Sequence, residues 1–167
     1  MLKLLAPNLS VNTLYDLNLL QLKQQGIMGI VFDLDNTIIP WDSPDLCPEV
    51  LVWIKNLASQ GFKLCLVSNN GKGRVRQIAG QCGIPFVARA LKPSRNGFRK
   101  AATAMKLTPD RVAVVGDQLF TDILGGNRLG MYTIWVKPMA TKEFIGTKIT
   151  RQFEKLAIHL LKATGRL

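Results

Sequence analysis

Four short apolar segments, each of strand length and each ending in a polar residue, constrain the fold of this chain most strongly. A continuous apolar run of this length is typical of a β-strand buried on both faces, and such strands belong to parallel sheets. Helical patterns lie between the runs, so the connections predict right-handed crossovers. The runs are residues 27–33 (IMGIVFD), 62–68 (FKLCLVS), 111–117 (RVAVVGD) and 131–137 (MYTIWVK).

The segments between these runs complete an α/β prediction with helices on both faces of the sheet. Each helical pattern is followed by glycine or by a Thr-Pro step, which commonly end helices. Residues 86–88 (FVA) predict a short additional strand. The chain is therefore expected to form one Rossmann-like domain, with helices at residues 49–60, 74–81, 95–106 and 121–129.

Two flanking segments are expected on either side of a core at residues 27–137. Residues 1–26 should be helical, with Asn18 capping a short helix that stops at Gly26. Residues 138–167 should form a basic amphipathic helix whose apolar stripe packs on the sheet while its charged face meets solvent. The stripe comprises Ile149, Phe153, Leu156, Ala157, Leu160 and Leu161, and the charged face comprises Arg151, Lys155, His159 and Lys162.

Composition narrows the class of protein. Of the 167 residues 47% are hydrophobic, which supports a packed core and argues against disorder. No apolar run approaches the roughly 18 residues of a membrane span, and the N-terminal run is too short for a signal peptide. Three cysteines without a C-x-x-C pattern argue against a disulfide framework or a zinc site, so we expect buried thiols in a cytoplasmic protein.

The net charge indicates an anionic partner. The chain has 22 Lys and Arg against 11 Asp and Glu, which gives a formal charge of +11. Nucleic acid, an anionic lipid surface and a phosphorylated substrate are all compatible with this charge.

Polar side chains gather where the predicted strands end. The carboxyl ends of parallel strands meet at one edge of a sheet, where ligands bind, so these residues should lie close together. They are Asp33, Asp35 and Thr37 after the first run, Ser68 and Asn69 after the second, Asp117 and Asp122 after the third, and Lys92 before the third long helix.

Such a set of groups suits phosphoryl transfer. Neighbouring carboxylates repel one another unless a cation joins them, and oxygen ligands suit Mg²⁺. With the charge of a phosphate neutralised by Mg²⁺ and by Lys92, a carboxylate can attack phosphorus and form an aspartyl-phosphate. A second carboxyl group can then act as acid for the leaving group and as base for water.

The order of these motifs resembles the haloacid dehalogenase-like (HAD) phosphatases. D-x-D-x-T, strand-S-N, K-P and G-D-x-x-x-x-D follow one another over residues 27–137, and Asn36 stands where a glycine is usual. G-D-Q-L-F-T-D-I-L-G-G-N-R-L-G at residues 116–130 resembles the narrower YqeG-type branch, which is related to mitochondrial phosphatidylglycerophosphate phosphatases.

The resemblance implies a role for each motif residue. Asp33 would be the nucleophile, Asp35 the general acid and base, and Lys92 the neutralising cation. Thr37 would support the loop, and Ser68 with Asn69 would bind phosphoryl oxygens. Mg²⁺ would be held by Asp33, by the carbonyl of Asp35 and by Asp117, with Asp122 a ligand directly or through water.

The spacing between motifs leaves no room for a cap domain. Residues 38–67 and 69–91 are filled by the core's own helix and strand, whereas an inserted domain needs at least about 50 residues. An open site suits a large substrate, with Arg74 and Arg95 among the basic residues expected at its rim. Trp41 could be either a lid over the substrate or an ordinary packing residue.

These features favour a Mg²⁺-dependent phosphomonoesterase that acts on phosphatidylglycerophosphate in phospholipid biosynthesis, in peripheral contact with the inner face of an anionic membrane. A phosphatase of a soluble ester, a nucleotide or a phosphoprotein is the alternative enzyme. A protein that binds nucleic acid or ribosomes through the same basic surface is the alternative from another class, and the intact catalytic set disfavours it. The oligomeric state stays open.

Overall fold

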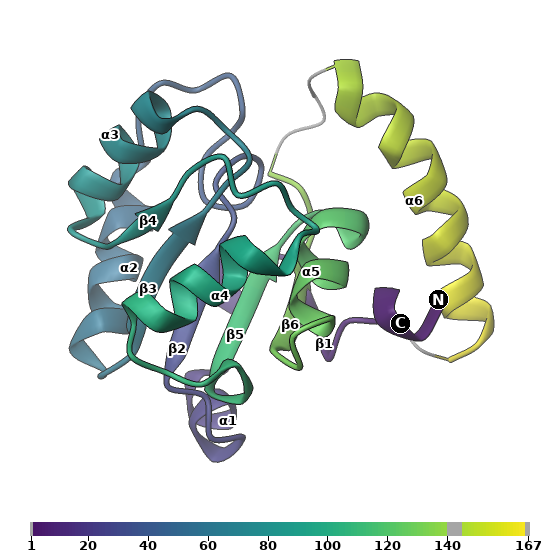
Figure 1. The fold of residues 1–167 in the computed structure, drawn as a ribbon, viewed down its shortest axis with the longest axis horizontal. Helices are drawn as coiled ribbons and strands as arrows, with labels where there is room; N and C mark the ends of the chain where they lie inside the picture. The colour runs from purple at the N-terminus through teal and green to yellow at the C-terminus, as the bar shows by residue number, and fades with distance from the viewer. Residues whose placement is uncertain (1, 140–144, 166–167) are drawn as a thin grey trace.

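The central feature of the fold is a parallel sheet in a computed structural model that describes residues 2–139 and 145–165. In this described part six strands take the order β1-β6-β5-β2-β3-β4, and each neighbouring pair is parallel (Figure 1). The strands are β1 (Leu9–Val11), β2 (Gly29–Phe32), β3 (Lys63–Val67), β4 (Phe86–Val87), β5 (Val112–Gly116) and β6 (Tyr132–Val136). The predicted α/β class is confirmed.

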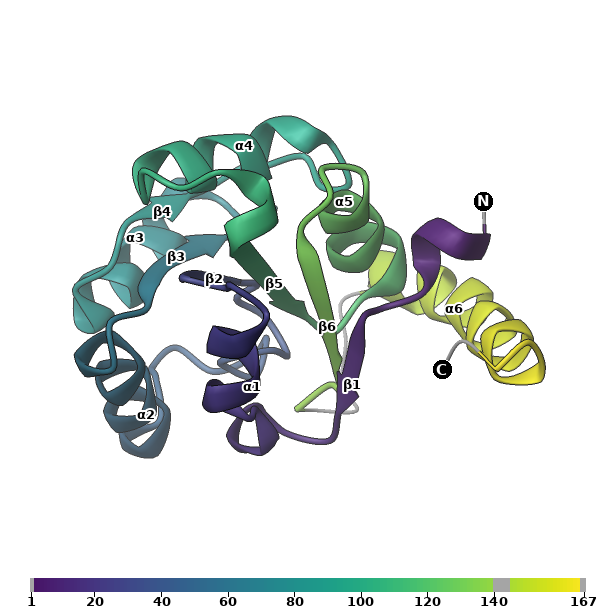
Figure 2. The same ribbon diagram turned by 90° about the horizontal axis from the view of Figure 1, so that it is seen from below.

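Helices cover both faces of the sheet. One face carries α1 (Leu19–Gln24), α2 (Pro48–Ser59) and α3 (Lys72–Cys82), and the other carries α4 (Arg95–Ala104) and α5 (Leu124–Asn127), as Figure 2 shows. The last helix, α6 (Ile145–Ala163), lies beside the β1 and β6 side of the sheet. Short helical turns complete the described chain: η1 (Leu2–Leu5), η2 (Leu14–Asp16), η3 (Pro109–Arg111) and the π-helical η4 (Leu119–Ile123).

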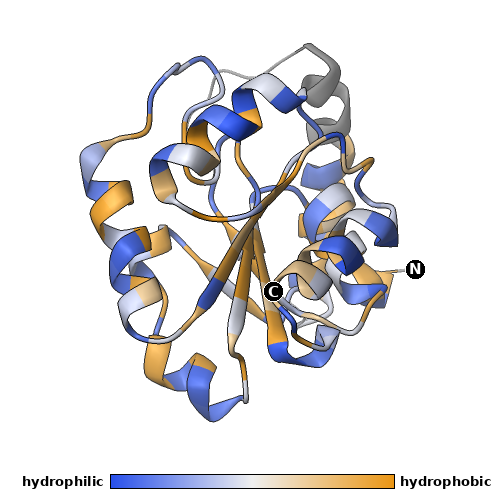
Figure 3. Ribbon diagram, turned by 60° about the vertical axis from the view of Figure 1, so that its left-hand side comes forward, coloured by the Kyte–Doolittle hydropathy of each residue, from blue (hydrophilic) through white to orange (hydrophobic). Residues whose placement is uncertain are grey.

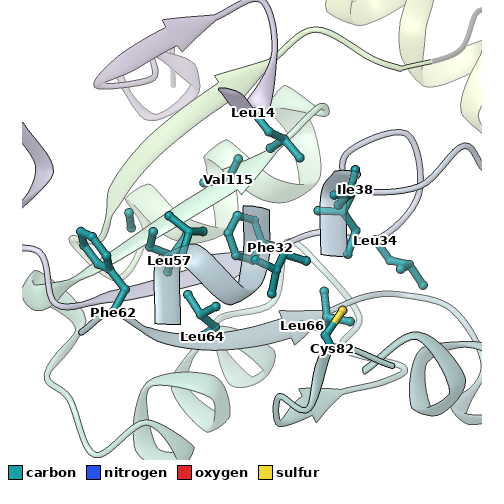
Figure 4. Close-up of a cluster of buried hydrophobic side chains, with 14 of the residues drawn as sticks. Leu14, Phe32, Leu34, Ile38, Leu57, Phe62, Leu64, Leu66, Cys82 and Val115 are labelled. Carbon is teal, nitrogen blue, oxygen red and sulfur yellow. The ribbon is translucent and has the colours of Figure 1, made fainter. Parts of the chain in front are cut away.

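Hydrophobic packing explains why the strands are apolar throughout. Phe32 of β2 lies in the core on the side of α2, with Leu57 and Leu66 (Figure 4). Val31, one residue earlier, packs on the opposite side with Phe98 of α4. The central strands are accordingly hydrophobic along their length, whereas the helices alternate in hydropathy (Figure 3).

The N-terminal segment differs in part from its prediction. Asn18 caps α1 as expected, with its side-chain oxygen accepting the N–H of Gln21 at 3.0 Å. Residues 1–26 are not simply helical, however, because they contain the edge strand β1. This strand has only three residues, too few for alternation to separate it from a loop, and it pairs with β6.

The C-terminal helix packs through a different stripe from the one predicted. Ala157 and Leu161 are buried against Leu5, Leu119 and Ile123, whereas Phe153, Leu156 and Leu160 are exposed. The expectation that the whole apolar stripe packs on the sheet is therefore wrong. The side chains of Ile149 and Arg151 lie outside the described residues.

The histidine and the three cysteines differ in burial. His159 is exposed on α6, as predicted. Cys65 and Cys82 are buried, and burial raises the pKa of Cys65 to about 12 and that of Cys82 to about 11. Cys47 is exposed, so the expectation of a buried thiol is wrong there, because it lies at the loop end of α2. Among the described residues, no helix is both long and apolar enough to cross a bilayer.

Candidate active site

Strand register brings the polar residues to one edge of the sheet. β2 lies between β3 and β5, with Phe32 opposite both Leu66 and Val115. The next residue, Asp33, donates its backbone N–H to the carbonyl of Val115 at 2.9 Å, which fixes it where the strand ends. Ser68 and Asp117 end the two flanking strands at the same level, so all three side chains face one place.

The loop after β2 turns sharply at Asn36. This residue has φ of 58°, in the left-handed region that asparagine tolerates better than most other non-glycine residues. Its N–H donates to the carbonyl of Ile39 at 2.7 Å, and its side-chain oxygen accepts the N–H of Trp41 at 3.4 Å. Thr37, which is fully buried, donates its hydroxyl to Asp117 at 3.5 Å. The turn thus links the first and third strand ends.

Lys92 lies between two buried carboxylates. Its Nζ donates to Asp33 Oδ1 and to Asp122 Oδ1, the latter at 2.6 Å, and all three side chains are at most 8% exposed. Asn69 holds the lysine's backbone from the neighbouring strand end, since its side-chain oxygen accepts the N–H of Lys92 at 2.7 Å and its amide donates to the Lys92 carbonyl at 3.3 Å. Lys92 is therefore held both at its backbone, by Asn69, and at its ammonium, by the two carboxylates.

Burial and charge shift the pKa values of this pair. Burial raises the pKa of Asp33 to about 7, against the opposing effect of Lys92 and with a further increase from Asp122. Burial alone would lower the pKa of Lys92, but the carboxylates of Asp122 and Asp33 raise it above its usual value. Lys92 is therefore a permanent cation in the site.

A π-helical turn positions Asp122. The sequence predicted a helix over residues 121–129, but helical structure begins at Leu119 in η4 and α5 ends at Asn127. Asp122 Oδ2 accepts the N–H of Gln118 at 3.2 Å. The Asp122 carboxylate lies close to Gly116. A Cβ atom at residue 116 would be 2.4 Å from the carboxylate carbon of Asp122, so only glycine fits at the end of β5.

Three carboxylates are placed to hold a metal ion. Asp33, Asp117 and Asp122 are all buried, and each offers an oxygen within 4.8 Å of those of the others. Their formal charge outweighs the single ammonium of Lys92, and a buried excess of negative charge is costly without a cation. The donor set is oxygen only, which fits a hard divalent cation such as Mg²⁺.

Asp35 has a different environment. It is bound by Arg74, whose Nε and Nη2 lie 3.2 and 3.0 Å from Asp35 Oδ1, and by the side-chain amide of Asn70. The carboxylate and the guanidinium are 25% and 27% exposed. Burial raises the pKa of Asp35 above its usual value, while Arg74 lowers it.

A pocket of about 490 Å³ opens over these groups. Ser68 lies in its wall, where its Oγ accepts the N–H of Asn70 at 3.1 Å. No inserted domain covers the pocket in the described chain, as predicted, because α2 with β3 and α3 with β4 fill the intervals between the motifs. The residues lining the pocket include Asp33, Asp35, Asn36, Trp41, Ser68, Asn69, Asn70, Arg74, Lys92, Gln118 and Thr121.

The two predicted rim residues differ in position. Arg74 lines the pocket, and besides Asp35 it donates to the carbonyl oxygens of Pro40, Trp41 and Ser43. Arg95 is exposed at the first turn of α4 and is not among the residues that line the pocket. Trp41 forms part of the pocket wall and is 37% exposed.

Two contacts of the site were not predicted. Glu154 of α6 is buried and accepts the N–H of Leu119 at 2.6 Å and that of Phe120 at 3.4 Å, at the start of η4. Trp135 donates its indole N–H to the carbonyl of Asp117 at 2.9 Å. The sequence offered one signal for the first contact, since Glu154 is the single acidic residue among residues 145–163.

Comparison with known proteins assigns the chain to a family. The family model described as mitochondrial PGP phosphatase matches residues 2–140. The chain belongs to the PGP phosphatase family. A relative from Bacillus subtilis, described as "Probable phosphatase YqeG", is 37% identical to this family member over 99% of the chain and 96% of the relative.

Other relatives carry the family's name. The mitochondrial phosphatidylglycerophosphatase of Saccharomyces cerevisiae is 30% identical over 78% of this chain and 77% of its own. The phosphatidylglycerophosphate phosphatase 1 of Arabidopsis thaliana is 28% identical over 93% of the chain, which spans about half (47%) of that longer protein.

Solved structures confirm the fold of this PGP phosphatase family member. The cobalt-bound deoxy-D-mannose-octulosonate 8-phosphate phosphatase of Haemophilus influenzae matches 86% of the chain and 92% of its own with a TM-score of 0.55, at 15% identity. A HAD-superfamily hydrolase from Ehrlichia chaffeensis matches 78% of the chain and 97% of its own with a TM-score of 0.55, at 14% identity. The chain thus has the fold of this HAD-superfamily hydrolase. Its membership of the PGP phosphatase family makes it a phosphatase, a hydrolase of phosphate monoesters.

Proposed function

We propose that this phosphatase removes the terminal phosphate of phosphatidylglycerophosphate in a Mg²⁺-dependent reaction through an aspartyl-phosphate on Asp33. The observation that carries the proposal is the buried contact of Lys92 with Asp33 and Asp122, beside Asp117, at the floor of an open pocket. The lipid substrate is supported by the names of the Arabidopsis and yeast relatives.

The first half-reaction uses the two carboxyl groups in different ways. A carboxylate oxygen of Asp33 attacks phosphorus while the P–O bond to the glycerol breaks. Asp35, two residues on and in the pocket wall, donates its proton to the departing oxygen. Lys92 lies against Asp33 and neutralises the charge that gathers there as the phosphoryl group arrives.

The second half-reaction restores the enzyme. Asp35, now a carboxylate, accepts a proton from water as the water oxygen attacks the phosphorus of phospho-Asp33. The bond between phosphorus and the Asp33 oxygen breaks, and inorganic phosphate leaves. Ser68 and Asn69 stay our predicted contacts for phosphoryl oxygens, since both line the pocket.

A divalent cation would be held by Asp33, Asp117 and Asp122, with Mg²⁺ the ion we propose and the carbonyl of Asp35 a further ligand. When bound, the ion offsets the negative charge of nucleophile and phosphate. Thr37 supports this arrangement through its hydrogen bond to Asp117.

The open pocket suits a headgroup that stays attached to a large lipid. Phosphatidylglycerophosphate has a phosphodiester near the reacting phosphate, and this second anion needs positive neighbours. Arg74 in the pocket wall and Arg95 at the start of α4 are the residues that we propose for this contact. Arg74 would then exchange part of its bond to Asp35 for a bond to the substrate.

The test measures phosphate release by the purified protein from phosphatidylglycerophosphate in mixed micelles, with Mg²⁺ and with excess chelator. We expect turnover that requires Mg²⁺, and loss of at least about 10³-fold in Asp33→Asn, which lacks the nucleophile. Asp110→Asn, an exposed carboxylate on η3, is the matched control.

A panel of soluble substrates separates the alternatives. Robust turnover of a sugar phosphate, a nucleotide or a phosphopeptide, without turnover of the lipid, would remove the lipid assignment and keep the phosphatase. No phosphate release from any substrate, together with salt-dependent RNA binding that survives in Asp33→Asn, would favour the nucleic-acid-binding alternative instead.

A further inference from the structure

The outer face of α6 is an exposed apolar stripe. Phe153, Leu156 and Leu160 are 62%, 57% and 41% exposed. Their spacing of three and four residues places them side by side along one line of the helix. Single exposed hydrophobic residues are common on protein surfaces, whereas a contiguous line of large ones marks an interaction site.

The fold already uses a neighbouring stripe of the same helix. Glu154, Ala157 and Leu161 have the same spacing, one residue further along, which turns their line by about 100° around the axis. All three are buried, and they attach α6 to η1 and η4. Among the described residues, the outer stripe therefore takes no part in the cluster that attaches the helix.

The charges around the outer stripe are positive. Lys155 and Lys162 are exposed, as is His159. Among residues 153–165 the one carboxylate side chain is that of Glu154, which is buried against η4. An apolar stripe of Phe and Leu with lysines on the adjoining polar face is typical of helices that lie in a membrane interface.

We propose that the outer face of α6, formed by Phe153, Leu156 and Leu160 with Lys155 and Lys162, docks on an anionic phospholipid bilayer. The apolar side chains enter the boundary between headgroups and acyl chains, and the lysines lie against lipid phosphates. The choice of a bilayer rests in part on the proposed function, since a lipid substrate resides there.

Charge disfavours a second copy of this chain as the occupant. A symmetric dimer through this stripe would bring Lys155 and Lys162 of one copy close to the same lysines of the other, in proteins of formal charge +11. A bilayer containing phosphatidylglycerol presents the opposite charge. α6 also begins at the edge toward which the central strands run, the edge where the pocket lies (Figure 1).

Vesicle flotation tests the proposal on the full chain. Vesicles of phosphatidylcholine alone are compared with vesicles that also contain phosphatidylglycerol. The apolar variant is Leu156→Ser with Leu160→Ser. Its control is Leu20→Ser with Val52→Ser, which changes two exposed aliphatic residues of α1 and α2 (66% and 67% exposed). The charge variant is Lys155→Gln with Lys162→Gln, and its control is Lys63→Gln with Lys106→Gln, two exposed lysines near the amino ends of the strands.

We expect the wild type to bind the anionic vesicles. The apolar variant should lose at least about tenfold in binding, and the charge variant about fivefold per lysine at modest salt, while both controls bind as the wild type does. Wild-type binding by the apolar variant, or equal binding to both kinds of vesicle, would overturn the proposal. The proposal would also be overturned if light scattering showed a dimer for the wild type and a monomer for the apolar variant.

Hydrolysis of p-nitrophenyl phosphate separates this proposal from the proposed function. The stripe lies outside the pocket, so the apolar variant should retain wild-type turnover of this soluble ester. Vesicle binding by a wild type that releases no phosphate would keep the docking surface and remove the proposed activity. Turnover of the substrate without vesicle binding would keep the proposed activity and remove the docking surface.

Discussion

The two carboxylates after β2 are two residues apart in the chain, yet they belong to two different halves of the site. The buried half contains Asp33, Lys92, Asp117 and Asp122, whose exposed fractions do not exceed 8%. The open half contains Asp35, Arg74 and Asn70, where the ion pair is about a quarter exposed. Both halves pair a carboxylate with a cation, but only in one of them are these side chains almost fully buried.

This difference corresponds to the two chemical tasks that we propose for the site. A nucleophile and its metal need a fixed arrangement of charge, and burial makes each charge depend on its partners. A group that gives up a proton and takes one back must reach both the leaving group and water, which suits a half-exposed carboxyl group. The comparison predicts that substitutions in the buried half cost stability as well as activity, and that those in the open half mainly cost activity.

The largest combined effect is expected for Lys92→Met. This change keeps the length of the side chain and removes the ammonium between Asp33 and Asp122. We expect activity to fall on the order of 10³-fold and the free energy of unfolding to fall by about 3–5 kcal/mol, because two buried carboxylates lose their cation. Phosphate release and urea unfolding measure the two effects. Lys100→Met on the exposed face of α4 is the control, and an unchanged unfolding midpoint in Lys92→Met would contradict the buried half as described.

A smaller loss, on the order of 10²-fold in activity, is expected for Asp117→Asn, which removes one charge from the proposed metal site. A ligand that binds the folded state and not the unfolded state stabilises the protein by mass action. Mg²⁺ should therefore raise the melting temperature of the wild type. Asp117→Asn should lose most of that increase, as measured by thermal unfolding with and without Mg²⁺. An equal increase in the variant would argue that the ion binds elsewhere.

In the open half, Arg74→Gln should lower activity by about tenfold and the free energy of unfolding by about 1 kcal/mol or less, because the pair is partly exposed. The guanidinium stabilises the carboxylate form of Asp35, so its removal raises the pKa of Asp35. The limb of the pH–rate profile that reports Asp35 should therefore move to higher pH.

Arg74→Lys sharpens this test. It keeps the charge and loses the planar fork that binds Asp35 and three carbonyl groups, so its pH limb should move less while its rate still falls. A limb that moves to lower pH in either variant would contradict the assignment of Asp35 as the proton-transferring group.

Sequence could predict the convergence of the site because the sheet is parallel. Once residues 27–33 and 111–117 are strands of one such sheet, Asp33 and Asp117 must emerge at the same edge, whatever the loops do. Arg74 could be placed near that edge in the same way. Its bond to Asp35 could not, because it depends on the path of the loop at residues 40–43, whose carbonyl oxygens orient the guanidinium.

Periodicity could likewise predict that α6 is amphipathic without selecting its buried stripe. Phe153, Leu156 and Leu160 look as suitable for the core as Ala157 and Leu161, and side-chain size even favours them. In the folded chain the line that contains Ala157 and Leu161 packs with Leu5 and Ile123. Which line is buried depends on the neighbours that η1 and η4 supply, and this is a tertiary property that the periodicity of one helix does not contain.

The smallest effect is expected for Glu154→Gln, which distinguishes the two halves from outside the pocket. Glu154 accepts the N–H groups of Leu119 and Phe120 at the start of the turn that carries Asp122, so it supports the buried half. Gln keeps one acceptor oxygen and loses the charge that strengthens these bonds. We expect the Mg²⁺ concentration for half-maximal activity to rise up to about tenfold, with kcat at saturating Mg²⁺ close to that of the wild type.

The Mg²⁺ requirement is the informative readout, because a merely structural loss would lower the melting temperature and leave that requirement unchanged. The pH limb that reports Asp35 should also stay in place, since Glu154 acts through η4 and not through the open half. Glu49→Gln, an exposed carboxyl group at the start of α2, is the matched control. If Glu154→Gln moved the pH limb and left the Mg²⁺ requirement unchanged, Glu154 would act on the open half of the site. The division between a buried metal site and an open proton-transfer site would then be wrong.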